Sequence, residues 1–192
     1  MHAAERMFLS RLRCKTMVFA HGRVIEIGAG TGRNIPFFSA ASVERLEVVE
    51  PDPHMRRRAA ERASAASFPI DLVDATAEDL PFADNYADVV VATLVFCSVD
   101  DPARAVQEVR RVLRPGGKLV FIEHIRSDEP WRSRLQDFVT PVWRRITANC
   151  HVNRATLALF LNAGFEIHEL ERLAVGLPWT HPVVAGFATA AQ

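Results

Sequence analysis

Cysteine, net charge and long apolar runs are all scarce in this sequence. Its 192 residues include three cysteines, Cys14, Cys97 and Cys150, and none belongs to a CxxC pair or to a Cys/His cluster with zinc-ligand spacing. We therefore expect no metal site. Widely spaced thiols and the lack of a signal peptide are typical of a reducing compartment, so we expect a cytoplasmic protein.

The charges of the chain cancel, with 23 basic and 23 acidic residues. A balanced chain has no electrostatic field that would attract nucleic acid or an anionic membrane, so neither is an expected partner. A spanning helix needs about 20 mostly apolar residues, and the N-terminal segment is interrupted by Arg11, Arg13 and Lys15. We expect no stable membrane anchor.

The length and the 49% hydrophobic content predict one globular unit, a short N-terminal helical segment 1–22 followed by a single domain 23–192. Apolar runs of strand length recur with helical stretches between them, which is the pattern of βαβ units and a parallel sheet. The predicted strands are Val24–Ile27, Leu46–Glu50, Ile70–Asp74, Asp88–Thr93 and Lys118–Glu123.

The remaining sequence predicts three helices and two closing strands. One helix is capped by Asp101 and stopped by residues 114–117. A second runs from Trp131 to Ile146 with Pro141 as a kink, and its apolar stripe either packs in the core or covers a substrate pocket. Asn153 is expected to cap the third. Phe165–Leu173 and Val183–Ala190 are the predicted closing strands.

The stretch Glu26-Ile27-Gly28-Ala29-Gly30-Thr31-Gly32 directly follows the first predicted strand. Dinucleotide sites use G-x-G-x-x-G, and Arg33 takes the place of the third glycine, which weakens the interpretation as an NAD-dependent oxidoreductase without removing it. The E-x-G-x-G-x-G pattern resembles the first motif of class I S-adenosylmethionine (SAM)-dependent methyltransferases. Glycines let the backbone turn tightly and approach a ligand closely.

Four further segments follow in the order of that family. They are Glu50 after the second strand, Asp74-Ala75 after the third, Asp79-Leu80-Pro81-Phe82 before the fourth, and Leu113-Arg114-Pro115-Gly116-Gly117 before the fifth. The resemblance implies an α/β, Rossmann-like class I methyltransferase fold, with a mostly parallel seven-stranded sheet, an antiparallel C-terminal strand and helices on both faces. In this family, the acid after the second strand bonds the ribose and the Asp after the third bonds adenine.

The resemblance also implies the cofactor, SAM, and the residues that bind it. These are Glu26, Gly28, Ala29, Gly30, Thr31, Gly32, Asn34, Glu50, Pro51, Met55, Asp74, Ala75, Thr76, Thr93 and Leu94. For a catalytic base we consider His124, which follows the fifth strand, His151, and Asp52 beside the ribose position. Each histidine has a structural alternative, and Cys97 is expected to be a small buried hydrophobe.

Four segments resemble a narrower group of methyltransferase-like proteins, which includes alkyl thiol S-methyltransferases and has relatives among quinone and phospholipid methyltransferases. They are Phe96–Val99, Glu123-His124, Pro141–Arg144 and Cys150–Arg154. The expected function is methylation of a small hydrophobic acceptor, with a thiol as the leading candidate, because a thiol ionises near neutral pH without a strong base.

Three alternatives remain open. The acceptor can instead be an oxygen, nitrogen or carbon atom of a quinone, phenol or natural-product intermediate. The chain can bind SAM without transferring its methyl group, or it can be the NAD-dependent enzyme noted above. The short N-terminal segment leaves little material to close a pocket, and its apolar side chains would suit a homodimer contact.

Overall fold

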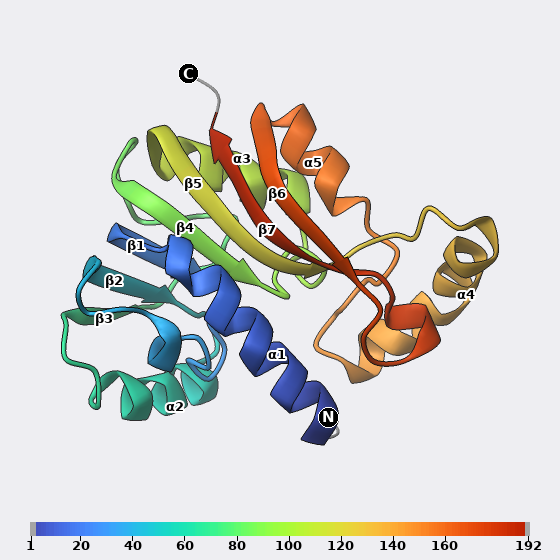
Figure 1. The fold of residues 1–192 in the computed structure, drawn as a ribbon, viewed down its shortest axis with the longest axis horizontal. Helices are drawn as coiled ribbons and strands as arrows, with labels where there is room; N and C mark the ends of the chain where they lie inside the picture. The colour runs from blue at the N-terminus through green and yellow to red at the C-terminus, as the bar shows by residue number, and fades with distance from the viewer. Residues whose placement is uncertain (1–2, 191–192) are drawn as a thin grey trace.

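A seven-stranded sheet forms the centre of the molecule in a computed structural model, which describes residues 3–190, with side chains from residue 8 on (Figure 1). The strand order is β3-β2-β1-β4-β5-β7-β6, and β7 alone points opposite to the other six strands. This is the sheet that the sequence predicts. The strands are β1 Gly22–Ile27, β2 Val43–Val49, β3 Ile70–Val73, β4 Ala87–Thr93, β5 Leu113–His124, β6 Phe165–Leu173 and β7 Val183–Ala190.

Helices lie on both faces of the sheet, as expected. Five α-helices are described, α1 Ala3–Thr16, α2 Pro53–Ala63, α3 Pro102–Val112, α4 Pro130–Ile146 and α5 Thr156–Asn162, together with 3-10 turns η1 Met17–Phe19, η2 Ile35–Phe37 and η3 Pro178–Thr180. Figure 1 shows α1 crossing the face nearest the viewer, while α3 and α5 lie behind the sheet. Among the described residues, no helix is both long and apolar enough to cross a membrane.

The alternation of side chains along the strands divides the core between the two faces. On β1, Val24 faces the cluster that contains Met17 and Ala59, while Ile25 faces the cluster that contains Val106 and Phe160. Both strand residues are fully buried. Burying large aliphatic side chains stabilises a fold by about 1.5–3 kcal/mol each, so the two-sided core fixes the register of the central strands.

Several local predictions differ from the structure. The β1–β2 connection has only the single turn η2, and the β3–β4 connection has no described helix but an isolated bridge between Thr76 and Asp79. The β1–β2 segment carries the three loop glycines and Pro36, and the β3–β4 segment carries Pro81, residues that disfavour a helix interior. Asn153 does not cap α5, because its amide donates to Asp137 (2.9 Å) and Ala155 precedes the helix. Asp101 does cap α3, through the Arg104 amide.

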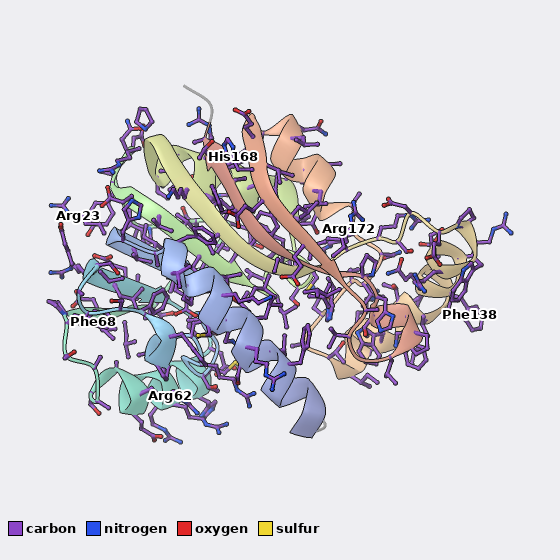
Figure 2. All side chains as sticks on the ribbon, viewed as in Figure 1. Arg23, Arg62, Phe68, Phe138, His168 and Arg172 are labelled. Atoms are coloured by element: carbon purple, nitrogen blue, oxygen red, sulfur yellow. The ribbon has the colours of Figure 1, made fainter. Side chains whose placement is uncertain are left out.

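The interpretation of α4 as a core-packing helix is wrong. Only Gln136 and Thr140 are buried in it, whereas Phe138 is 83% exposed, and the helix runs through Pro141 without ending there. Figure 2 shows Phe138 on the outer side of α4, away from the sheet. The helix is held by polar bonds instead: the Gln136 amide donates to the carbonyls of Ile125, Val152 and His181.

Candidate active site

The glycine loop leaves β1 at the carboxyl edge of the parallel strands, where open α/β sheets bind their ligands. A Cβ at Gly28 would lie 2.8 Å from Val95 Cγ2, and one at Gly32 would lie 3.1 Å from Ala59, so both positions need glycine for packing. Gly30 differs, because at φ +57° its only neighbour would be Met55 Sδ at 3.9 Å. The loop therefore keeps a space open beside Gly30.

Glu50 connects that loop to the end of β2. Its side chain is buried, with Oε2 accepting from the Gly30 N–H (2.6 Å) and Oε1 from the Asp52 N–H (3.0 Å). The neighbouring Ala29 N–H donates to the Val49 carbonyl (3.1 Å). A carboxylate has about four acceptor sites, so Glu50 retains capacity for the two ribose hydroxyls that the family resemblance leads us to expect there.

A buried polar network lies beneath the loop. The Asn34 amide donates to Glu26 Oε1 and to Thr93 Oγ1, at 2.9 Å each, and Asn34 Oδ1 accepts from Arg13 Nε (2.7 Å). The second carboxylate oxygen of Glu26 is buried without a hydrogen-bond partner. Burial raises the pKa of Glu26 from 4.5 to about 8, against the opposing effects of Asn34 and Arg13. A buried acid that lacks a donor on one oxygen is suited to receive a cation.

The other expected cofactor residues line the same edge of the sheet. Asp74 follows β3 with its side chain 70% exposed, and Arg56 of α2 binds both of its oxygens (2.9 and 2.8 Å). Arg56 also donates to the Pro51 carbonyl (3.2 Å). Met55 is 39% exposed beside the space at Gly30. The half-buried Thr31 and Ala75 and the exposed Thr76 complete the set.

Of the three candidate bases, Asp52 has a structural task. Its Oδ1 accepts from the His54 and Met55 amides (2.8 and 2.9 Å) and so caps α2. The Met55 hydrogen bond, aided by that of His54, lowers the pKa of Asp52. A weaker base that already holds two donors is a poor proton acceptor, and the geometry favours a positioning role for Asp52.

The loop after β4 is fixed by Glu123, which the sequence did not single out as a site residue. This fully buried carboxylate accepts from the amides of Val95 (2.7 Å), Phe96 (3.1 Å) and Cys97 (3.3 Å). Burial raises the pKa of Glu123 well above its usual range, and the three amides oppose that rise. Leu94, just before the loop, has φ +58°, a strained value for a side chain with a Cβ.

The Glu123 contacts predict a specific loss of stability. Glu123→Gln is expected to lower the free energy of unfolding by about 1–3 kcal/mol, because an amide accepts through one oxygen only and its NH2 group would face one of the buried N–H donors. Urea unfolding followed by circular dichroism measures this. The exposed Glu166 on β6 is the control, since Glu166→Gln should change stability by less than about 0.5 kcal/mol. Equal stability of both variants and the wild type would contradict the contacts.

Both candidate histidines lie near this loop, together with two cysteines. His124, at the end of β5, has its Nδ1 3.5 Å from Cys150 Sγ. Cys97 Sγ, His124 and Cys150 Sγ offer ligand atoms that all lie within 4.8 Å of one another. The His151 amide donates to the Cys97 carbonyl (2.6 Å), and His151 Nδ1 is buried without a partner. Cys97 is buried as expected, but its neighbours could not be read from sequence, because Cys150 is remote in the chain.

Comparison with known proteins shows the family of the chain. Residues 25–121 match the methyltransferase domain family, and the chain is 35% identical over 186 residues to human thiol S-methyltransferase TMT1B, covering 93% of this chain and 74% of that protein. The chain belongs to the methyltransferase domain family. It is a SAM-dependent methyltransferase, and SAM is its cofactor.

Solved structures share the fold. A protein of Bacillus halodurans C-125 superposes with a TM-score of 0.78 at 16% identity, covering 96% of this chain and 99% of that chain. The N-methyltransferase NodS of Bradyrhizobium japonicum, in complex with S-adenosylhomocysteine, gives 0.72 at 20% identity, covering 97% and 87%. At these identities the likeness concerns the sheet and its helices alone.

The residues of the methyltransferase fit the cofactor. The space at Gly30 allows the cofactor to approach the backbone closely. The remaining acceptor sites of Glu50 can bind its hydroxyl groups, and the unpartnered oxygen of Glu26 can pair with its ammonium group. When bound, SAM supplies a methyl group on a positively charged sulfur, already activated for displacement. The protein's part is to hold the acceptor in line and to exclude water from it.

Proposed function

We propose that this methyltransferase transfers the methyl group of SAM to a small hydrophobic thiol. The observation that carries the proposal is the 35% identity to a human thiol S-methyltransferase over most of both chains. A cytoplasmic location is part of the proposal, supported by cysteines that are all free among the described residues.

The side chains beyond the glycine loop support a soft, apolar acceptor. Leu94 and Trp143 pack against the buried cluster of Cys97, Cys150 and Val152. Trp143 belongs to α4 and also meets Trp179 edge-on, with ring centroids 5.9 Å apart. We infer that α4 covers the acceptor through Trp143, although most of its apolar stripe, including Phe138, is exposed. An apolar cover excludes water and favours a hydrophobic thiol over a charged amine.

The acceptor's ionisation also favours sulfur. A thiol of ordinary pKa near 8.5 is ionised about thirty-fold more than a phenol near 10 at neutral pH. Asp52 caps a helix, so the candidates for a base are His124 and His151. The Glu123 carboxylate next to His124 already accepts three backbone amides, so a readily ionised acceptor needs the least help from the protein.

The test is transfer of label from methyl-labelled SAM to a mixed panel of alkyl thiols, phenols, quinols and amines, with products identified by mass spectrometry. We expect a labelled thioether and an equal amount of S-adenosylhomocysteine. An alkanol of the same carbon skeleton as the best thiol is the matched control and should stay unlabelled, because an alcohol hardly ionises at neutral pH.

Other outcomes would replace the proposal. Label on a phenol or quinol, with none on any thiol, would make the chain an O- or C-methyltransferase. Calorimetric binding of SAM with no label on any acceptor would indicate a protein that binds the cofactor for another purpose. Equal label on amines and thiols would remove the preference for sulfur.

A further inference from the structure

Three side chains from distant parts of the chain form a compact group of metal-ligand type beside the candidate acceptor site. Cys97 comes from the loop after β4, His124 from the end of β5, and Cys150 from the segment after α4. Their ligand atoms lie within 4.8 Å of one another, and the Cys150 Sγ to His124 Nδ1 distance is 3.5 Å. Ligand atoms in a tetrahedral zinc site with sulfur and nitrogen donors are separated by about 3.5–3.8 Å.

The donor set and its surroundings are those of a zinc site with an open position. Two thiolates and one imidazole suit a d¹⁰ cation, and catalytic zinc sites hold the metal with three protein ligands and leave the fourth position to water or substrate. Cys97 and Cys150 are buried and His124 is half-buried, so the group is screened from bulk water but not sealed.

The frame around these ligands is rigid. The Glu123 carboxylate fixes the Cys97 amide, and Arg154 Nη1 donates to the Phe96 and Val99 carbonyls (2.7 Å each), so the loop that carries Cys97 is held from two sides. The Cys150 amide bonds the Thr147 carbonyl (3.1 Å), and the next residue's amide bonds the Cys97 carbonyl. Ligands held by a second layer of bonds lose little entropy when they bind a metal.

We propose that Cys97, His124 and Cys150 bind one Zn²⁺ and that the fourth position of this zinc takes the acceptor thiol. The second half rests on the proposed function. It is supported by Leu94, a candidate cofactor residue, which packs directly against the Cys97 and Cys150 cluster and so places the zinc next to the cofactor edge.

The binding step releases protons and changes no oxidation state. Each cysteine thiol loses its proton as it forms a sulfur–zinc bond, and His124 binds as the neutral imidazole through a ring nitrogen. The acceptor thiol then replaces a zinc-bound water, giving its proton to solvent, and is held as a thiolate. Zinc thus performs the deprotonation for which no strong base is evident among the described residues.

The first test is the metal content and zinc affinity of the full chain, purified under reducing conditions without chelator. We expect one tightly bound zinc per chain, and after its removal we expect Co²⁺ to restore a complex with a thiolate-to-cobalt absorption band. Cys97→Ser and Cys150→Ser should each weaken Zn²⁺ binding by at least about 100-fold. Far-ultraviolet circular dichroism and SAM affinity confirm that each variant is folded.

The chain contains matched controls for both ligand types. Cys14 is exposed on α1 and His168 is exposed on β6, where its Nε2 lies 2.6 Å from Thr189 Oγ1 (Figure 2). Cys14→Ser and His168→Ala should leave the zinc content and the cobalt band unchanged. Wild-type protein that binds no Zn²⁺ more tightly than Cys97→Ser would overturn the metal site, as would a Cys97–Cys150 disulfide that forms in place of zinc binding.

A second pair of measurements separates a zinc ligand from a base at His124. His124→Cys keeps a ligand atom and should retain zinc, because the longer zinc–sulfur bond, about 2.3 Å against 2.0–2.1 Å for nitrogen, compensates for the shorter side chain. His124→Ala should lose zinc. The cobalt band of the wild type should shift on addition of the acceptor thiol but not of its methyl thioether.

Failure of this inference is distinguishable from failure of the proposed function. Thiol methylation at the wild-type rate by metal-free enzyme would overturn the zinc role and leave the thiol activity standing. Zinc bound at one per chain, with a cobalt band that no thiol shifts and label found on a phenol, would overturn both the thiol ligand and the thiol activity while retaining the metal site.

Discussion

Gly30→Ala is expected to reduce SAM affinity by at least about 100-fold, which corresponds to about 2.7 kcal/mol, while the protein still folds. The added methyl group would meet only Met55 Sδ at 3.9 Å in the protein, so it causes no internal clash. It would occupy the space that the loop keeps open beside the Glu50 carboxylate. The positive φ of +57° adds a strain of about 1–2 kcal/mol, which lowers stability moderately. Isothermal titration with SAM and thermal unfolding measure the two effects separately.

Gly164→Ala is the matched control for Gly30→Ala. Gly164 has φ +80°, and a Cβ there would meet nothing within 4 Å, so its backbone strain is comparable. It precedes β6, whose first residue pairs with the end of β7 at the amino edge of the parallel strands, opposite the glycine loop. This variant should lose similar stability and no SAM affinity. If both variants bound SAM equally well, the cofactor would not approach the loop at Gly30.

The order of the sheet and the cofactor edge were predictable because both depend on local patterns. Five apolar runs of strand length need burial on two faces, and a glycine loop after the first of them determines where the backbone turns. The predicted ends of the strands were less accurate than their order. β2 begins at Val43 rather than Leu46, and β5 begins at Leu113, five residues before the predicted Lys118, because edge residues pair through backbone bonds that polar side chains also allow.

The acceptor side could not be predicted in the same way. Cys97, His124 and Cys150 meet only because β5 lies beside β4 and α4 returns to the same edge, and no sequence spacing records that meeting. The prediction that the apolar stripe of α4 packs in the core was wrong for a related reason. Helical spacing of Phe138, Val142 and Ile146 shows that they share a face, but not whether that face meets the core.

Glu26→Gln is expected to change stability and cofactor affinity in opposite directions. The carboxyl group has a pKa of about 8 in the folded protein against 4.5 ordinarily, because it is buried. Below 4.5 both the folded and the unfolded chains are protonated there. Between pH 4.5 and pH 8 only the unfolded chain releases the proton, so this residue makes stability fall as pH rises, by on the order of 5 kcal/mol in total. Above pH 8 the effect is constant. Glutamine does not titrate, so the variant should lack this decline in the free energy of unfolding. Urea unfolding at a series of pH values from about 5 to about 9 measures it.

The same substitution should weaken SAM binding at least about ten-fold, because a neutral amide does not pair with the cofactor's ammonium group as a carboxylate does. Pairing requires ionised Glu26, so wild-type binding at neutral pH should release nearly one proton, and Glu26→Gln should release none. Calorimetry in two buffers of different ionisation enthalpy measures this. Glu47→Gln is the control, since Glu47 is also buried with an unpartnered oxygen but bonds Arg45 and Tyr86 away from the loop. Equal proton release by Glu26→Gln and wild type would assign the proton to another group. Glu26 lowers the stability of the folded protein at neutral pH. Its unpartnered oxygen explains its presence there, because that oxygen can receive the ammonium group of SAM.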